Sequence, residues 1–113
     1  MAEVFNRASD AVQAAGVAIY TAPNNASTDR AVVLSVMVAN VNGSDAADVS
    51  LRIQTAAGGN LTGGRLAHTI SIAADSSLEL IANKLVLKNG EKLFIQASVD
   101  NRLEATVSAL EMT

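Results

Sequence analysis

The sequence contains no cysteine, one proline and only three aromatic residues, Phe5, Tyr20 and Phe94. Without cysteine, the chain can form neither a disulfide framework nor a thiolate metal site. Because aromatic side chains are so few, the core must be built from Val, Leu, Ile and Ala, which belong to the 50% of residues that are hydrophobic. The same scarcity argues against a carbohydrate-binding module, since sugar binding on a β-sandwich usually relies on exposed aromatic platforms.

Charge is also scarce. Charged residues make up 17% of the chain, the net charge is −3 and the isoelectric point is about 4.9, whereas about a quarter of an average sequence is charged. Binding to a phosphate backbone requires clustered Lys and Arg, so we expect no nucleic-acid partner. A surface rich in Ser, Thr, Asn and Ala suits packing against neighbouring molecules.

Long apolar runs are missing as well. No run approaches the roughly 20 residues needed to cross a bilayer, and residues 1–10 lack the apolar segment of a secretory signal. We therefore expect no membrane partner. The length of 113 residues fits one domain with a two-layer core, which we expect to span residues 1–113.

Short apolar and polar residues alternate along most of the chain, and turn-forming residues separate the alternating runs. The clearest example is 48–55, where Val49, Leu51 and Ile53 alternate with polar residues. Such spacing predicts an all-β fold, an antiparallel β-sandwich of jelly-roll or immunoglobulin-like type with about eight short strands. Residues 1–15 are ambiguous, because their composition suits a helix while their alternation suits a strand. We expect them to form either an N-terminal arm or, as we favour, an edge strand.

The turns predict how the strands are connected. Asn42-Gly43-Ser44-Asp45 predicts a hairpin between the runs that flank it. At Asn89-Gly90 a tight hairpin would place Leu87 opposite Lys92 and mix buried with exposed faces, so we expect either a bulge or, as we favour, a turn that carries the chain from one sheet to the other. The last two runs, 92–99 and 103–112, are predicted to pair with each other.

The segment 56–65 contains four glycines and is predicted to be a long, flexible surface loop with Leu61 near its tip. Loops of this length in small domains are often contact elements. The run that follows, 66–73, is predicted to be a strand with Leu66, His68, Ile70 and Ile72 on one face.

No group of residues indicates catalysis. The chain has no Cys, its single His68 lies in a strand pattern, and no nucleophile elbow is present. The four glutamates of the second half are expected to face solvent: Glu79, Glu91, Glu104 and Glu111. Asp45 and Asp48 match no calcium-loop spacing, and turn formation explains them better. We expect a protein that is not an enzyme and has no metal site and no cofactor.

Three segments resemble a family of small virion proteins of tailed bacteriophages, notably phages of marine bacteria. They are AIYTAP (18–23), AVVLSVMVANVNGSDAADVSL (31–51) and the closing stretch 70–112. In that family a strand ending in Tyr-Thr-x-Pro precedes a Val-rich strand ending in Asn-Val-x-Gly. A Leu-Val-Leu-x-x-Gly-Asp/Glu-Lys segment and a final Ser-x-Leu-Glu strand follow. The similarity covers most of 17–112; the opening and the glycine-rich segment depart from it.

The resemblance implies a structural virion protein on the capsid surface, assembled in the host cytoplasm. Its expected partners are the major capsid protein or other virion proteins, and it is expected to form a homo-oligomer. Head decoration, as a knob or cement protein, is the favoured role. The alternatives are a ring-forming neck, tail or fibre component and a carbohydrate- or host-surface-binding module. Candidate contact residues are apolar or flexible groups outside the core pattern: Val4, Phe5, Gly58, Gly59, Asn60, Leu61, Gly63 and Gly64.

Overall fold

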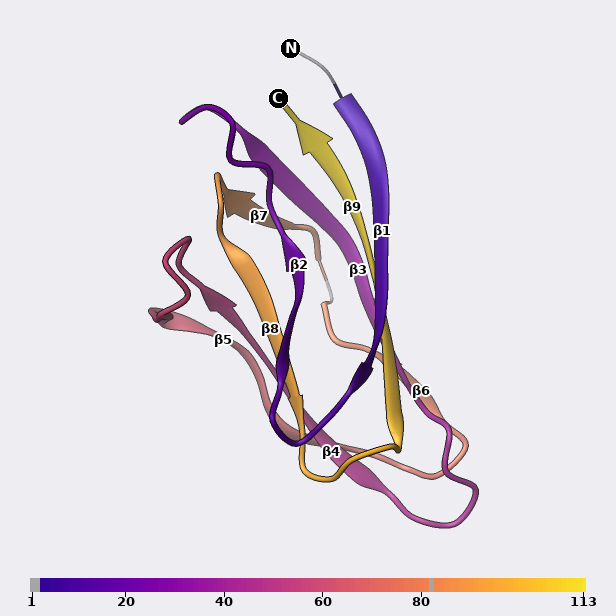
Figure 1. The fold of residues 1–113 in the computed structure, drawn as a ribbon. Helices are drawn as coiled ribbons and strands as arrows, with labels where there is room; N and C mark the ends of the chain where they lie inside the picture. The colour runs from indigo at the N-terminus through magenta and orange to yellow at the C-terminus, as the bar shows by residue number, and fades with distance from the viewer. Residues whose placement is uncertain (1–2, 82) are drawn as a thin grey trace.

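The computed structural model describes residues 3–81 and 83–113, and it contains two antiparallel β-sheets packed face to face (Figure 1). Sheet A has the order β1-β9-β3-β6, with β7 also paired to β3, and sheet B has the order β2-β8-β4-β5. The strands are β1 (Glu3–Val12), β2 (Val17–Thr21), β3 (Arg30–Asn40), β4 (Ala47–Gln54), β5 (Asn60–Ile72), β6 (Ser77–Glu79), β7 (Leu85–Lys88), β8 (Lys92–Ala97) and β9 (Leu103–Met112). In the described part of the chain, no helix has the length and apolar character needed to cross a membrane.

The strand order identifies the sandwich as a jelly roll. β6 and β7 pair with two successive parts of the same side of β3, so together they act as one interrupted edge strand. Counted this way, eight strands form two four-stranded sheets, and the chain passes from one sheet to the other at nearly every connection. Of the two architectures that the sequence left open, the structure therefore has the jelly roll.

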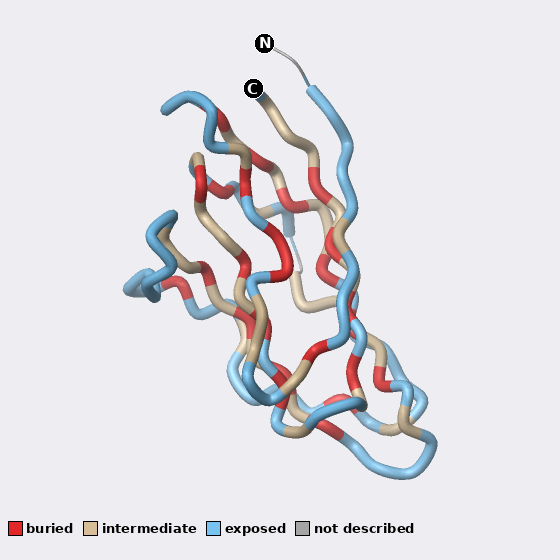
Figure 2. Tube along the Cα trace, in the orientation of Figure 1, coloured by how far each residue is buried: buried red, intermediate tan, exposed pale blue. Residues whose placement is uncertain are grey.

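The buried residues form a core between the two sheets (Figure 2), and apart from Tyr20 the side chains of this core are aliphatic. The alternation predicted for three strands is confirmed, because every second residue is buried: Val49, Leu51 and Ile53 in β4, Leu93, Ile95 and Ala97 in β8, and Leu103, Ala105, Val107 and Ala109 in β9. Side chains of successive strand residues point to opposite faces, so each of these strands presents one apolar face to the other sheet.

The hairpin predicted at Asn42–Asp45 is wrong, because β3 belongs to sheet A and β4 to sheet B. The buried Asn40 supports this crossing. Its side-chain amide donates to the carbonyl oxygens of Asp45 and Ile72, both at 3.0 Å, and its side-chain oxygen accepts from the backbone N–H of Asn42 at 2.9 Å. Local turn residues mark where the chain bends, whereas these long-range bonds determine which way it goes.

The predicted pairing of the last two strands is also wrong. β9 lies between β1 and β3 in sheet A, while β8 lies between β2 and β4 in sheet B. By contrast, the prediction for Asn89-Gly90 is confirmed, since β7 is in sheet A and β8 in sheet B. Gly90 has φ of 77°, a backbone conformation that favours glycine, and a Cβ there would lie 2.8 Å from the Cβ of Ala56. Both the backbone conformation and this close approach therefore require glycine in the turn.

Residues Glu3–Val12 form β1, which pairs with β9 along all ten residues and leaves one side of the strand free. On that side, the backbone N–H groups of Arg7 and Ala11 donate to the side-chain oxygens of the preceding Asn6 and Asp10, both at 2.8 Å. Two of the donors that a sheet edge would offer to another strand are thus already bonded within the chain.

The long loop predicted over 56–65 is wrong in extent, because β5 begins at Asn60 and only a short turn separates it from β4. The register of β5 against β4 shifts three times, and Thr69 has φ of 49°. The shifts place Ala67 opposite the buried Leu51, so Leu66 faces outward and is 36% exposed, whereas Ile70 and Ile72 keep the same face opposite Val49 and Ala47, with Ile72 buried. The single apolar face predicted for this run is therefore interrupted.

Candidate interaction surfaces

The predicted contact residues fall into two groups that the structure does not bring together. Val4 and Phe5 are neighbours on β1, and Gly58 to Gly64 belong to the β4–β5 hairpin. β1 is an edge strand of sheet A and β5 an edge strand of sheet B, on opposite sides of the sandwich (Figure 1). Val4 and Phe5 also point to opposite faces, since Val4 is opposite Glu111 and Phe5 is opposite Leu110.

Phe5 begins an apolar row across the outer face of sheet A. Phe5 is opposite Leu110, Leu110 is opposite Val32, and Val32 is opposite Val86. The row therefore crosses four strands, and we call it the sheet A row. Its two ends are the most exposed, with Phe5 76% and Val86 58% exposed. Leu110 follows polar residues on the outer side of β9, and only the register shows that it joins three other apolar residues.

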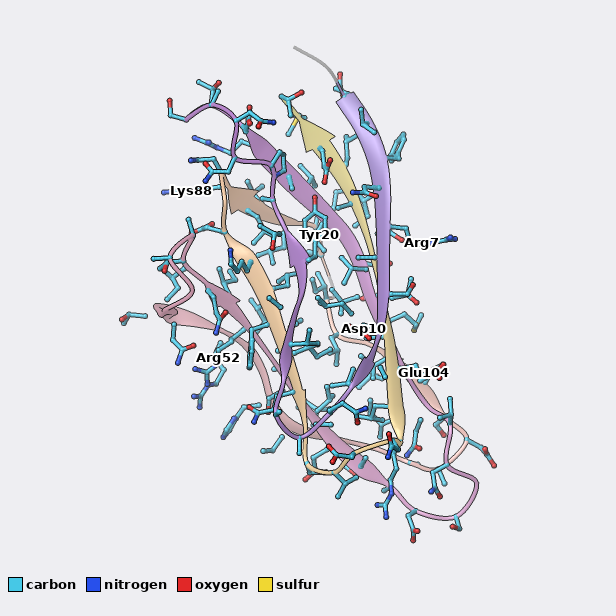
Figure 3. All side chains as sticks on the ribbon, in the orientation of Figure 1. Arg7, Asp10, Tyr20, Arg52, Lys88 and Glu104 are labelled. Carbon is cyan, nitrogen blue, oxygen red and sulfur yellow. The ribbon has the colours of Figure 1, made fainter. Side chains whose placement is uncertain are left out.

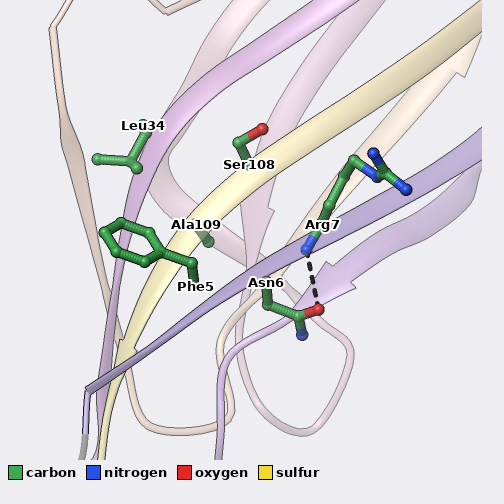
Figure 4. Close-up of a pocket in the computed structure, with 6 residues that line it drawn as sticks. All are labelled: Phe5, Asn6, Arg7, Leu34, Ser108 and Ala109. Carbon is green, nitrogen blue, oxygen red and sulfur yellow. Dashed lines mark hydrogen bonds between the residues drawn. The ribbon is translucent and has the colours of Figure 1, made fainter.

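A hollow of 480 Å³ lies beside this row, lined by Phe5, Asn6, Arg7, Leu34, Ser108 and Ala109 (Figure 4). Leu34 sits where the register between β3 and β9 shifts, and it has no partner on β9. The bulge leaves the Leu34 side chain half-buried among outward-facing groups instead of in the core. The row is apolar, whereas the hollow is lined by apolar and polar residues in equal number, with Arg7 as its one charged residue.

Tyr20 and Glu111 link the two sheets at the end that holds the chain termini. The buried Tyr20 hydroxyl of β2 donates to the Glu111 carboxylate of β9 at 2.6 Å, and the Asn6 side-chain amide donates to the same oxygen at 3.2 Å. Burial, and then the hydrogen bond and charge of Glu111, raise the pKa of Tyr20 well above its usual range. This cluster is a structural contact, because all three polar groups are used to join β1, β2 and β9.

The prediction that all four glutamates face solvent is wrong for Glu111 and for Glu79. The Glu79 carboxylate accepts from the backbone N–H groups of Val36 at 2.7 Å and Ile81 at 3.2 Å. It occupies the gap between β6 and β7, where β3 has no strand partner on that side. Glu79 therefore satisfies backbone donors that an interrupted edge strand would leave free.

The β4–β5 hairpin carries a second hollow, of 290 Å³, lined by Arg52, Asn60, Leu61, Thr62, Gly63 and Arg65. Arg52 and Arg65 are directly opposite each other on β4 and β5. Arg52 points away from the sandwich, because its neighbours Leu51 and Ile53 face the core (Figure 3). Gly63 has φ of 80° and open space where a Cβ would be, so its backbone is accessible. Alternation alone could not predict this pair, since Arg65 follows Arg52 by 13 positions and only the register places them opposite each other.

The end of the sandwich opposite this hairpin is acidic. Its connections between strands, 41–46, 73–76 and 98–102, with the start of β4, hold four aspartates and one arginine: Asp45, Asp48, Asp75, Asp100 and Arg102. Backbone bonds bring the connections together, from Asp75 N–H to the Asn42 carbonyl at 3.1 Å and from Val41 N–H to the Arg102 carbonyl at 2.7 Å. Within residues 3–81 and 83–113, no three His, Asp or Glu side chains are placed to hold a metal ion.

No protein-family model matches the sequence, and no curated protein matches it at a significant level. Solved structures do share the fold. A chain of the Bacillus endospore appendages, which form a family of disulfide-linked pili, has a TM-score of 0.55 and 16% identity, covering 99% of this chain and 87% of that one. A chain of the T13 particle of infectious bursal disease virus (IBDV) has a TM-score of 0.52 and 14% identity, covering 96% of this chain and 30% of that one. A chain of the T=1 particles derived from this virus has a TM-score of 0.51, with 13% identity, 97% of this chain and 30% of that chain covered.

The present chain thus spans about a third of the length of the viral chains that it matches. At 13–16% identity, the similarity shows that the jelly-roll fold is shared, and nothing more.

Proposed function

We propose that this chain is a structural protein of a tailed-bacteriophage virion, which decorates or cements the outside of the capsid by binding the lattice of the major capsid protein. The sequence resemblance over most of 17–112 supports the phage assignment. The shared fold with chains of a virus particle and of a pilus agrees with a structural role, because each of those chains is part of a repeating assembly.

The observation that carries the proposal is the sheet A row. A solvated strand face normally carries polar side chains, yet here Phe5, Leu110, Val32 and Val86 form a continuous apolar line across it. Exposed apolar patches of this kind mark sites of association. The sandwich measures 47 by 25 by 21 Å, so its broad face can supply the roughly 800 Å² per partner of a standard interface. We propose that the major capsid protein binds this face.

The decisive measurement is the copy number of the chain in purified particles, by quantitative mass spectrometry against the major capsid protein. Copies on the order of hundreds support lattice decoration. About six to a few dozen copies, the order of closed rings, refute decoration in favour of a neck or tail part. Absence from particles refutes the virion role.

The contact itself is tested by Phe5→Asp, with Val41→Asp as the control at a similarly exposed apolar position, 54% exposed, away from the row. We expect Phe5→Asp to lower occupancy on particles at least about tenfold, since loss of a buried aromatic anchor costs 2 kcal/mol or more. Val41→Asp should leave occupancy unchanged. Equal occupancy of the two variants would exclude the sheet A row as the capsid contact.

A further inference from the structure

Two arginines of like charge face each other on the outer side of sheet B. Arg52 of β4 and Arg65 of β5 are direct cross-strand partners, and like charges in this position destabilise a sheet. In the part of the chain that the structure describes, the one ion pair joins Arg102 to Asp45 at 3.6 Å. No carboxylate of the described chain therefore compensates the Arg52–Arg65 pair.

The surroundings of the pair suit a carboxylate ligand. Both arginines line the 290 Å³ hollow of the β4–β5 hairpin together with Asn60, Thr62 and Gly63, which adds neutral hydrogen-bonding groups to two guanidinium forks. Guanidinium groups bind carboxylates through paired hydrogen bonds. Because a Cβ at Gly63 would meet nothing within 4 Å, the approach to the hollow is open on that side.

The acidic end of the same molecule offers the complementary charge, but it cannot reach the pair within one copy. Asp45 precedes β4 and Arg52 lies near its far end, and at about 3.3 Å per residue they are about 23 Å apart along the strand. Asp48, the nearest of these aspartates, is on the same outward face of β4 but four residues from Arg52, about 13 Å along the strand, and no ion pair joins the two within one copy. Between two copies, the same two regions can meet directly.

We propose that the Arg52–Arg65 pair is a docking site for the aspartate carboxylates at the acidic end of a second copy of this chain. The contact is head-to-tail and heterologous, so it generates a closed ring or an open filament according to the rotation between copies. The inference rests on charge and register alone and does not depend on the virion role or on the sheet A row.

The first test is sedimentation velocity of the intact chain at about 0.01 M and about 1 M salt, where the Debye length is about 30 Å and about 3 Å. We expect association at low salt and its loss at high salt. The variant Arg52→Glu with Arg65→Glu should weaken self-association at least tenfold. The control is Lys84→Glu with Lys88→Glu, which makes the same change in net charge on two exposed lysines outside the hollow, and it should associate as the parent does.

A second test uses charge reversal at the other end, with Asp45→Lys and Asp75→Lys in one chain. Neither this variant nor the Arg52→Glu, Arg65→Glu variant should self-associate. A mixture of the two should associate again, because the acidic end of one meets the arginine pair of the other, and the lysines at the reversed end meet the reversed glutamates in the same orientation. Circular dichroism checks that each variant is folded, and Arg52→Gln with Arg65→Gln replaces the arginine variant if reversal unfolds it.

Three outcomes would overturn the proposal: a parent chain that is monomeric at low salt, self-association that the arginine variant retains, or self-association that is lost equally in the lysine control. Association that survives these changes but disappears in Phe5→Asp would place the contact between copies on the sheet A row instead. Failure here would leave the copy number on particles, and hence the proposed function, unaffected.

Discussion

Replacing Arg65 by glutamine should stabilise the isolated protein, because it removes the repulsion between Arg65 and Arg52. Directly opposite residues have Cβ atoms about 5 Å apart, so a separation of about 7 Å is reasonable for the two exposed charges. At that distance in water-like dielectric the repulsion is about 0.6 kcal/mol. For a chain of 113 residues this corresponds to a rise in Tm of about 2–3 °C.

Differential scanning calorimetry at about 0.01 M salt and low protein concentration measures this shift on the monomer. The gain should shrink below about 1 °C at about 1 M salt, where the Debye length is about 3 Å. Arg7→Gln is the matched control, since Arg7 is exposed on β1 opposite the uncharged Ser108 and its removal changes the net charge equally. This control should not raise Tm.

The double variant Arg52→Gln with Arg65→Gln, compared with the two single variants, completes a double-mutant cycle. Once one arginine is gone the repulsion is gone, so the second substitution should add no further stability. If Arg65→Gln lowers Tm at low salt, or if its gain is unchanged at high salt, the two arginines do not repel each other and the main argument for an anionic partner is refuted.

Two further predictions concern buried polar groups. Tyr20→Phe should cost about 1.5–3 kcal/mol by urea denaturation at neutral pH, because it removes a hydrogen bond to the Glu111 carboxylate. Because the pKa of Tyr20 is raised in the folded protein, the unfolded chain loses the Tyr20 proton first, so the contribution of Tyr20 to the free energy of unfolding is fully present below about pH 10 and falls above it. The free energy of unfolding of the Phe variant should therefore decline less steeply at alkaline pH, and an equal slope for the two proteins would contradict the assignment. Asn40→Asp should cost about 3 kcal/mol or more, since a carboxylate cannot donate to the two carbonyl oxygens that Asn40 now binds. If the lost donor is the cause, the free energy of unfolding of the Asp variant should recover in part near pH 3, where the carboxyl is protonated and can donate again. A variant as stable as the wild type at pH 7 would contradict this reason.

Sequence alternation predicted which face of each strand is buried wherever the strand is regular. In β9, for instance, Leu103, Ala105 and Val107 could be assigned to the core because every second residue is apolar. The same reasoning excluded a tight hairpin at Asn89-Gly90, since the faces would not have matched. Alternation is a local property that follows from strand geometry, which explains why it can be recognised without the structure.

Strand partners could not be predicted in this way. β8 and β9 are adjacent in sequence and each has one apolar face, but these faces point at each other across the core instead of lying side by side. Alternation is equally compatible with both arrangements. The long-range bonds that distinguish them, such as those from Asn40 to Asp45 and Ile72, come from residues that look like ordinary turn formers in the sequence.

The extent of the candidate surfaces could not be predicted, for the same reason. Phe5 was predicted as a contact residue because it lies outside the core pattern, but its partners Val32 and Val86 belong to strands far away in the chain. Bulges add a second difficulty, since the shift at Leu34 and those along β5 reverse the facing of side chains without any change in composition. Register therefore determines which residues share a surface.

The edges of the two sheets indicate how neighbouring molecules can bind this protein. On β1, the N–H groups of Arg7 and Ala11 are bonded to preceding side chains, and the opposite edge of sheet A is interrupted between β6 and β7, with Glu79 bonded to the exposed donors. In sheet B, the register shifts along β5 break the regular ladder that an added strand requires. Strand addition is thus disfavoured at these three edges. At these three edges a partner contacts side chains, and the sheet A row and the Arg52–Arg65 pair are the surfaces where side-chain chemistry without an internal partner is concentrated. Because these two surfaces lie on different sheets, the proposed capsid contact and the proposed contact with a second copy do not exclude each other.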